Sequence, residues 1–205
     1  MPARDEYVFG GPLDAATVHL CVDMQNLYAP GAPWATPWFE RVLPAVSEIA
    51  DRHPESTLFT RFIPPQTARD AGGAWRVLFE KWPEVTLENL DPELLELAPV
   101  LRARVPPAIQ LDKRVYSAFH GSGLREELRH RGARALVISG AETDVCVLAT
   151  VMDAVDLGYR VLLARDAICS SSDRTHDALM TLYHERLSAQ IEIADTATLL
   201  GLWQG

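Results

Sequence analysis

The stretch ARALVISGAETDVCVLATVMDAVDLGYRVLLARD, residues Ala133 to Asp166, predicts the fold. Its first part, Ala133–Ser139, is a short apolar run of the kind that forms a buried strand. The next part, Thr143–Leu157, is predicted as a helix that ends at Gly158, and Tyr159–Ala164 is predicted as a second strand. A strand, a helix and a strand in this order form a βαβ unit, which implies a parallel sheet with right-handed crossovers.

The rest of the chain repeats this alternation of strands and helices. Further strands are predicted at Thr17–Met24, Ser56–Ile63, Ala108–Asp112 and Gln190–Ala194, and further helices at Phe39–His53, Leu124–His130 and Ser172–Leu187. No internal repeat, low-complexity tract or linker divides the sequence. We therefore expect residues 1–205 to form a single α/β domain with a three-layer, Rossmann-like arrangement.

The segment from Ile63 to Pro107 departs from this pattern. It is long and rich in Pro, Trp and Glu, with short helices expected around Ala74–Lys81 and Pro92–Leu97. Long connections of this kind are usually functional. We interpret the segment, at about residues 63–107, as an excursion that covers an active site or makes a subunit contact, and the sequence leaves both interpretations open.

Composition excludes several classes of function. The 205 residues carry 19 Lys and Arg against 28 Asp and Glu, a net charge of −9, which argues against nucleic-acid and anionic-membrane partners. The three cysteines, Cys21, Cys146 and Cys169, are widely spaced and form no C-x-x-C pair, so neither a disulfide framework nor a zinc site is expected. Met1–Gly10 resembles no signal peptide, and no apolar run approaches the ~20 residues of a membrane span. We expect a cytoplasmic protein that acts on a small molecule.

Polar residues follow three of the predicted strands, at the sheet edge where α/β proteins bind ligands. Asp23 ends the first strand, and Lys113 directly follows the third. Cys146 falls in the first turn of the helix after the fourth, with Thr143 or Asp144 as its cap. Unpaired N–H groups and the helix dipole favour a thiolate there and can hold an oxyanion. Each residue also has a structural interpretation: a turn or cap for Asp23, a solvated charge for Lys113 and a small buried hydrophobe for Cys146.

The three residues support one another as a group. We expect their strands to be neighbours, so Asp23, Lys113 and Cys146 would converge at one edge of the sheet. A carboxylate beside a thiol can accept its proton, and an ammonium group stabilises the resulting thiolate. These residues therefore predict an Asp-Lys-Cys triad for nucleophilic catalysis.

Three motifs resemble those of the isochorismatase-like cysteine hydrolases, the superfamily that includes nicotinamidases and N-carbamoylsarcosine amidohydrolase. The motifs are V-D-M-Q-N at Val22–Asn26, K-x-x-Y-S-A-F at Lys113–Phe119 and G-A-E-T-D-V-C-V at Gly140–Val147. The resemblance spans nearly the whole chain and is weakest between Pro64 and Pro107. Each motif alone is moderately specific, whereas three in order at strand ends make a strong case.

The resemblance implies a six-stranded parallel sheet with helices on both faces and a catalytic triad of Asp23, Lys113 and Cys146. It further implies a cis peptide bond before Glu142, with the backbone N–H groups of Glu142 and Cys146 as an oxyanion hole. By family analogy, the cysteine forms an acyl-thioester that water then hydrolyses. No cofactor is implied, and a homo-oligomer, either dimer or tetramer, is expected.

The sequence also departs from one branch of this superfamily. Metal-binding nicotinamidases carry an Asp-x-His pair after the second strand, where this chain has Thr60–Pro65, and no histidine occurs between His53 and His120. We therefore predict no metal and do not favour nicotinamide as the substrate.

Four residues are candidates for substrate binding. Arg61 could pair with a carboxylate or ureido oxygen, or form a structural ion pair. Trp75, together with Trp82, could line a lid or belong to the core or an interface. Tyr116 and Phe119 lie close to Lys113 in sequence and are better candidates for the pocket.

Three classes of function follow from these observations. The first is a cysteine-dependent hydrolase of a small amide, ureide or related C–N bond. The second is isochorismatase-type vinyl-ether hydrolysis, although family members with that activity commonly lack the cysteine because no acyl intermediate forms. The third is a non-catalytic binding or redox-sensing protein in which Cys146 is merely oxidisable.

Overall fold

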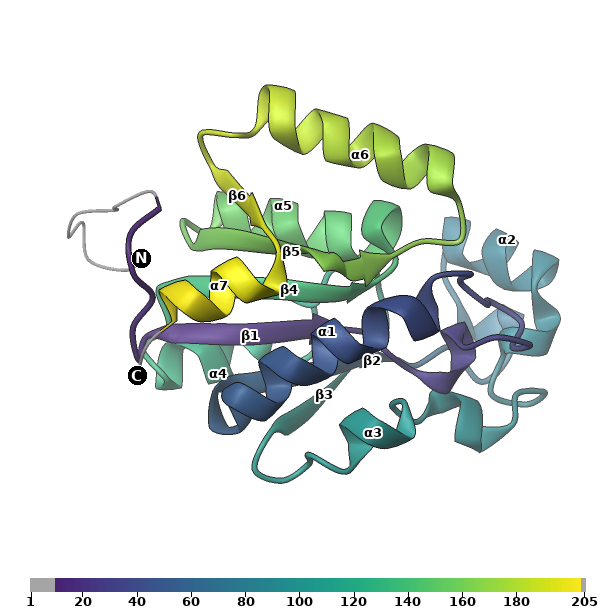
Figure 1. The fold of residues 1–205 in the computed structure, drawn as a ribbon. Coiled ribbons are helices and arrows are strands. Elements are labelled where there is room, and N and C mark those ends of the chain that lie inside the picture. The colour runs from purple at the N-terminus through teal and green to yellow at the C-terminus, as the bar shows by residue number, and fades with distance from the viewer. Residues whose placement is uncertain (1–9, 204–205) are drawn as a thin grey trace.

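Strand β1 (Thr17–Val22) lies in the middle of a parallel sheet in the computed structural model, which describes residues 10–203. Within those residues the sheet has six strands in the order β3-β2-β1-β4-β5-β6 (Figure 1). The other strands are β2 (Thr57–Phe62), β3 (Ile109–Lys113), β4 (Ala135–Ala141), β5 (Arg160–Cys169) and β6 (Ile191–Ala194). The predicted six-stranded parallel sheet is confirmed. The strand order reverses between β1 and β4, which is where ligands bind in sheets of this type.

Helices cover both faces of this sheet. The α-helices are α1 (Phe39–Arg52), α2 (Ala74–Lys81), α3 (Pro99–Arg102), α4 (Leu124–His130), α5 (Leu148–Asp156), α6 (Asp173–Arg186) and α7 (Thr196–Leu202). Short 3-10 turns are η1 (Asn26–Tyr28), η2 (Pro54–Ser56), η3 (Ala68–Asp70), η4 (Pro83–Val85) and η5 (Pro92–Leu95), and η6 (Thr143–Val147) is a π-helical turn. The α7 helix was not predicted. None of the helices in residues 10–203 is long and apolar enough to cross a membrane.

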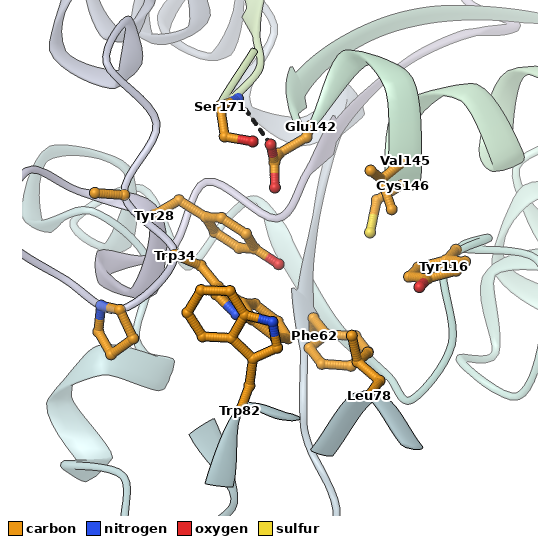
Figure 2. Close-up of a pocket in the computed structure, with 12 residues that line it drawn as sticks. Tyr28, Trp34, Phe62, Leu78, Trp82, Tyr116, Glu142, Val145, Cys146 and Ser171 are labelled. Atoms are coloured by element: carbon orange, nitrogen blue, oxygen red, sulfur yellow. Dashed lines mark hydrogen bonds between the residues drawn. The ribbon is translucent and has the colours of Figure 1, made fainter. Parts of the chain in front are cut away.

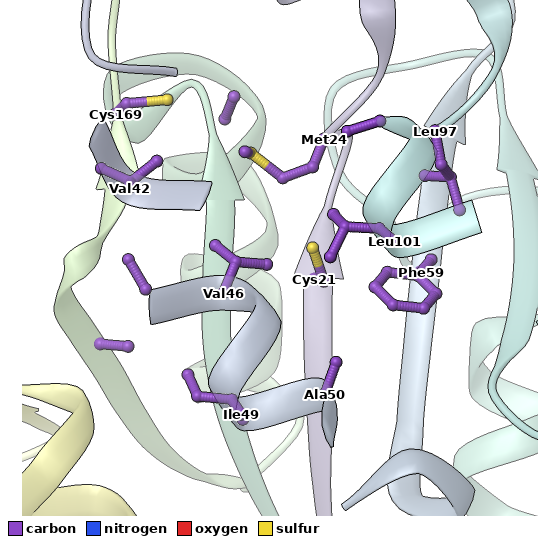
Figure 3. Packing of buried hydrophobic residues seen from close by; sticks show 14 of the residues in the cluster. Cys21, Met24, Val42, Val46, Ile49, Ala50, Phe59, Leu97, Leu101 and Cys169 are labelled. Atoms are coloured by element: carbon purple, nitrogen blue, oxygen red, sulfur yellow. The ribbon is translucent and has the colours of Figure 1, made fainter. Parts of the chain in front are cut away.

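Alternation along β1 separates two hydrophobic cores. Cys21 belongs to the core formed with α1, α3 and α7, where Val46 and Leu101 pack near it (Figure 3). Val18 and Leu20 belong to the core formed with α4, α5 and α6 on the opposite face. Because successive side chains of a strand point to opposite faces, one apolar strand supplies both layers of contact.

Strand β5 is longer than predicted. The expected strand ended at Ala164 because the charged pair Arg165 and Asp166 follows it, but the strand continues to Cys169. Both charged residues are exposed, at a point where the pairing register between β4 and β5 shifts. An irregularity of this kind tolerates polar residues inside a strand. The apolar run therefore ends at Ala164, although the strand continues to Cys169.

The excursion at residues 63–107 contains α2 and α3 and joins the sheet through the V-D-M-Q-N motif. The Gln25 side chain donates to the carbonyl oxygens of Phe62 (3.1 Å) and Leu95 (2.7 Å) and accepts from the Phe62 N–H (2.7 Å). The Asn26 side chain donates to the Glu93 carbonyl (3.0 Å). These bonds hold the excursion beside the carboxyl ends of β1 and β2.

Candidate active site

A buried ion pair lies beyond the carboxyl end of β1. Asp23 follows the last residue of the strand and has a positive φ of 50°, which aspartate tolerates better than most residues. One carboxylate oxygen, Oδ2, lies 2.6 Å from Lys113 Nζ, and both side chains are fully buried. The other oxygen, Oδ1, accepts a hydrogen bond from the Thr60 hydroxyl (2.6 Å). A buried charge needs partners of this kind, since an uncompensated one is strongly destabilising.

Lys113 reaches Asp23 from a strand that is not adjacent to β1, contrary to the expectation from the sequence. It is the last residue of β3 and pairs in register with Phe62 of β2, so β2 separates its strand from β1. The expectation that all three strands are neighbours is therefore wrong for β3. The long lysine side chain crosses the gap: its Nζ donates to the Val115 carbonyl (3.1 Å) and to Cys146 Sγ (3.4 Å).

Cys146 lies in the π-helical turn between β4 and α5. The peptide bond from Ala141 to Glu142 is cis, as the family resemblance implied. The predicted caps are wrong: Glu142 occupies the N-cap position and its side chain makes no capping bond. Instead, the Thr143 hydroxyl donates to the Cys169 carbonyl (3.2 Å), and Asp144 accepts from the Ser170 hydroxyl (2.6 Å). These side chains fasten the cysteine-bearing turn to the end of β5.

Gly140 allows β4 to approach β1 just before this turn. Its φ is 113°, a conformation that side-chain-bearing residues rarely adopt. A Cβ atom there would lie 2.6 Å from the backbone nitrogen of Val22 and would clash with the Val22 carbonyl as well. The glycine therefore sets the spacing between the strand ends that carry Asp23 and Cys146.

The electrostatics of the site favour a neutral thiol at rest. Burial raises the pKa of Cys146, and the Asp23 carboxylate raises it further, while the Lys113 ammonium lowers it too little to compensate. The expected resting thiolate is therefore not favoured here. Burial lowers the pKa of Lys113, but the interactions of its ammonium group with Asp23 and Cys146 together outweigh burial and leave that pKa raised, so the ammonium stays charged.

Cys146 opens into a cavity of about 340 Å³, a size suited to a small molecule (Figure 2). Most of its wall is aromatic or aliphatic, and Glu142 and Ser171 supply polar groups. The lining residues are Tyr28, Pro33, Trp34, Ala35, Phe62, Leu78, Trp82, Tyr116, Glu142, Val145, Cys146 and Ser171.

Two of the four predicted substrate contacts lie on the cavity side of the molecule. Tyr116 lines the cavity directly. Trp75 is not part of the lining and packs behind it, with its ring centroid 4.6 Å from that of Tyr116 and 6.1 Å from that of Phe62. Trp82, its partner in the lid interpretation, does line the cavity, as does Leu78 of the same excursion.

The other two predicted contacts lie elsewhere. Phe119 is buried in the core beneath α4 and α5, where its ring stacks on Tyr159 at 6.0 Å. Arg61 forms ion pairs with Asp112 (2.9 Å) and Glu96 (2.7 Å) and does not line the cavity. The structural ion pair was one of the two interpretations of Arg61, and it is the one that the structure supports.

Several lining residues were missed at the sequence level, above all Tyr28 and Trp34. Tyr28 ends the three-residue turn η1, and Trp34 lies in the loop that follows it, within the turn-forming run Pro30–Pro37. An aromatic residue in a turn-rich loop beyond a buried strand was the available signal. Periodicity could not find these residues because a three-residue turn and an irregular loop are too short or too irregular to show any.

The remaining thiols are structural. Cys21 is fully buried in the core of Figure 3, and Cys169 lies 3.4 Å from the Thr36 hydroxyl. Burial raises the pKa of both, to about 12 for Cys169. Neither lines the cavity. In residues 10–203 no three His, Cys, Asp or Glu side chains lie where they could hold a metal ion together.

Known proteins share sequence or fold with this chain. A family model described as "Isochorismatase domain" matches residues 17–195. The uncharacterized isochorismatase family protein PncA of Bacillus subtilis is 29% identical over 139 residues, which cover 68% of this chain and 66% of that protein, so the match spans about two-thirds of its length. The ureidoacrylate amidohydrolase RutB of Caulobacter segnis is 31% identical over 188 residues, covering 82% of this chain and 77% of RutB.

Solved structures share the fold. A cysteine hydrolase from Pseudomonas syringae pv. phaseolicola has a TM-score of 0.76 at 21% identity, with 94% of this chain and 96% of that chain covered. The N-carbamoylsarcosine amidase from Thermoplasma acidophilum has a TM-score of 0.71 at 18% identity, with 88% and 96% covered. At these identities the likeness concerns the fold alone.

Proposed function

The chain belongs to the isochorismatase family, and from this membership and the surroundings of Cys146 we propose that it is a cysteine-dependent hydrolase of a small amide, ureide or related C–N bond. The observation that carries the proposal is the contact of Cys146 Sγ with Lys113 Nζ, which is itself paired with Asp23, beside a cavity of small-molecule size. Of the three cysteines in the chain, Cys146 alone lines that cavity.

The first half of the reaction forms a thioester. The Asp23 carboxylate takes the proton from Cys146 Sγ, and the sulfur attacks the substrate carbonyl carbon. The carbonyl oxygen becomes an oxyanion that accepts hydrogen bonds from the backbone N–H groups of Glu142 and Cys146. The Lys113 ammonium stabilises the thiolate during attack. The C–N bond then breaks, the proton on Asp23 moves to the leaving nitrogen, and ammonia or an amine departs.

The second half restores the enzyme. Asp23 takes a proton from a water molecule, whose oxygen attacks the thioester carbonyl. The C–S bond breaks, the acid product leaves, and the proton held by Asp23 returns to Cys146 Sγ. One water is consumed for each C–N bond cleaved. Because the resting thiol is neutral, the first proton transfer is part of every turnover.

An ammonia-release screen over carboxamides, ureides and carbamoyl amino acids tests the proposal, with isochorismate as a parallel substrate. Once a substrate is found, Cys146→Ala should lower turnover by roughly 10⁴-fold or more, because the nucleophile is lost. Cys169→Ser, which changes a thiol outside the cavity, should retain activity. Mass spectrometry of the wild-type enzyme quenched in turnover should show an acyl adduct on Cys146.

Two outcomes would contradict the proposal. Turnover of isochorismate that survives Cys146→Ala would favour vinyl-ether hydrolysis, which needs no acyl intermediate. Hydrolysis of an amide that survives the same change would exclude Cys146 as the nucleophile.

The proposal includes no metal. The residues after β2, Ile63–Pro65, offer neither a histidine nor a carboxylate. Prolonged treatment with a chelator should therefore leave the rate of ammonia release unchanged. Stoichiometric zinc or iron in the purified protein, lost together with activity, would overturn this part of the proposal.

A further inference from the structure

Three large aromatic side chains form part of the cavity wall. Tyr28 and Trp34 come from the segment between β1 and α1, and their ring centroids are 6.2 Å apart. Trp82 comes from the excursion at residues 63–107 and lines the same space. Figure 2 shows the three rings gathered below the carboxylate of Glu142. Aromatic faces carry partial negative charge and attract cations.

Glu142 adds a full negative charge to this wall. Its side chain is half-buried, and Oε2 accepts a hydrogen bond from the Ser171 N–H (2.7 Å). It forms no ion pair with any described residue, and within residues 10–203 no lysine or arginine lines the cavity. The nearby charges of Asp23 and Lys113 cancel each other in their 2.6 Å pair. The net charge facing the cavity is therefore negative.

The Tyr28 hydroxyl is a further polar group without a partner. The side chain is only 3% exposed, and its hydroxyl has no hydrogen-bond partner among residues 10–203. Figure 2 shows that hydroxyl pointing into the cavity. Burial and the nearby acidic groups raise its pKa, so the group is a neutral phenol that can accept from an N–H or donate to an oxygen. A hydroxyl that faces a cavity without a protein partner is expected to bind a ligand or water.

From these contacts we propose that the substrate carries a cationic ammonium group, held among Tyr28, Trp34 and Trp82 beside the Glu142 carboxylate. This inference rests on the proposed function, since it places the scissile carbonyl of the same molecule at Cys146. The rings attract the cation, Glu142 neutralises it, and a protonated amine can also donate to the Tyr28 hydroxyl. An anionic substrate would meet a carboxylate with no compensating cation.

Charged thiol reagents test the cation site without any substrate. Methanethiosulfonates form a mixed disulfide with Cys146 and release methanesulfinate, so the cationic trimethylammonioethyl and anionic sulfonatoethyl reagents differ mainly in charge. With each rate divided by that of free cysteine, the cationic reagent should label Cys146 at least about tenfold faster, equivalent to ~1.4 kcal/mol. Equal rates, or faster labelling by the anion, would overturn the cation site.

Three variants test whether Glu142 and the aromatic residues cause the faster labelling by the cationic reagent. Glu142→Gln should lower the cation-to-anion ratio several-fold, and Trp82→Leu should lower it without removing a charge. Glu126→Gln makes the same change in net charge on the exposed surface of α4 and should leave the ratio unchanged. An equal drop in Glu126→Gln and Glu142→Gln would mean that the overall charge of the protein sets the ratio, which would refute the assignment.

Matched amides separate this inference from the proposed function. Carboxamides with a terminal trimethylammonium group, in a series of chain lengths, are compared with their tert-butyl isosteres, which have the same shape and no charge. The best cationic amide should have a kcat/KM about tenfold above its isostere. If the neutral isosteres are hydrolysed equally well, the cation inference fails and the hydrolase stands. If no amide releases ammonia while labelling of Cys146 remains cation-selective, the proposed function fails and the cation site stands.

Discussion

Two buried polar clusters lie along β1, and they differ in what surrounds them. The first, within the strand, is His19, whose ring nitrogens contact Thr57 of β2 (3.2 Å) and Ser139 of β4 (2.8 Å). The second, beyond the strand end, is Asp23, which is bonded to Thr60 of β2. Both clusters connect β1 to the same neighbouring strand on one side.

The difference lies in charge and access. Burial lowers the pKa of His19 to about 3, so its ring is neutral, and each of its nitrogens has a partner inside the sheet. Asp23 and Lys113 are buried as charges, and through Cys146 their cluster reaches a cavity. Burial of polar groups therefore does not by itself mark a site. Charges retained beside a thiol and an open cavity make the second cluster the candidate site.

Among substitutions in the two clusters, Lys113→Met should have the largest effect on stability and turnover. It leaves Asp23 as an uncompensated buried charge, so we expect a loss of about 3–5 kcal/mol in the free energy of unfolding, together with loss of turnover. Urea unfolding and ammonia release measure the two effects. Adding Asp23→Asn should restore much of the stability and none of the activity. Unchanged stability in Lys113→Met would mean that the ion pair is not buried as described.

His19 should affect how the stability of the protein depends on pH and should not affect turnover. Its pKa is lowered in the folded state from 6.5 to about 3, so its contribution to stability is complete above about pH 6.5 and is lost as the pH falls towards 3, because the unfolded chain binds the proton first. Between about pH 6.5 and pH 4 this group alone should remove about 3 kcal/mol. His19→Gln, which can hydrogen-bond but does not titrate, should flatten the difference while leaving turnover intact. An identical pH profile in both proteins would disprove this role.

The smallest effects come from two matched threonines on β2. Thr60→Val removes the hydroxyl that donates to Asp23, and we expect roughly 1–2 kcal/mol of destabilisation and about a tenfold loss of kcat. Thr57→Val removes a partner of His19 and should destabilise by a similar amount with kcat unchanged. Thermal unfolding and steady-state kinetics on both variants provide the test. Equal losses of kcat would show that the two clusters act as one.

Regular elements were predictable from the sequence because they are periodic and bounded. The helices at Ala74–Lys81 and Leu124–His130 have the predicted bounds, since a glycine precedes each and its apolar residues recur at helical spacing. The second half of β5 was not predicted because the charged residues Arg165 and Asp166 interrupt its apolar pattern. The α7 helix is a single short element beyond the last predicted strand.

The site was predictable in part for the same reason. Asp23 and Cys146 follow adjacent strands at the point where the strand order reverses, so strand-end reasoning places them together. Lys113 joins them through the length of its side chain, which no strand pattern encodes. Phe119 directs its ring into the core instead of the cavity, and Tyr28, Trp34 and Trp82, which line the cavity, come from a short turn and from loops.

The close approach of β4 to β1 at Gly140 offers a way for descendants of this chain to lose activity during evolution. Any side chain at that position would push the Val22 backbone away and separate the strand ends, even with every reactive group still encoded. A descendant could thus keep its aspartate, lysine and cysteine and still be a pseudoenzyme. When genomes are searched for inactive members, the residue at the position of Gly140 is therefore as informative as those at Asp23, Lys113 and Cys146.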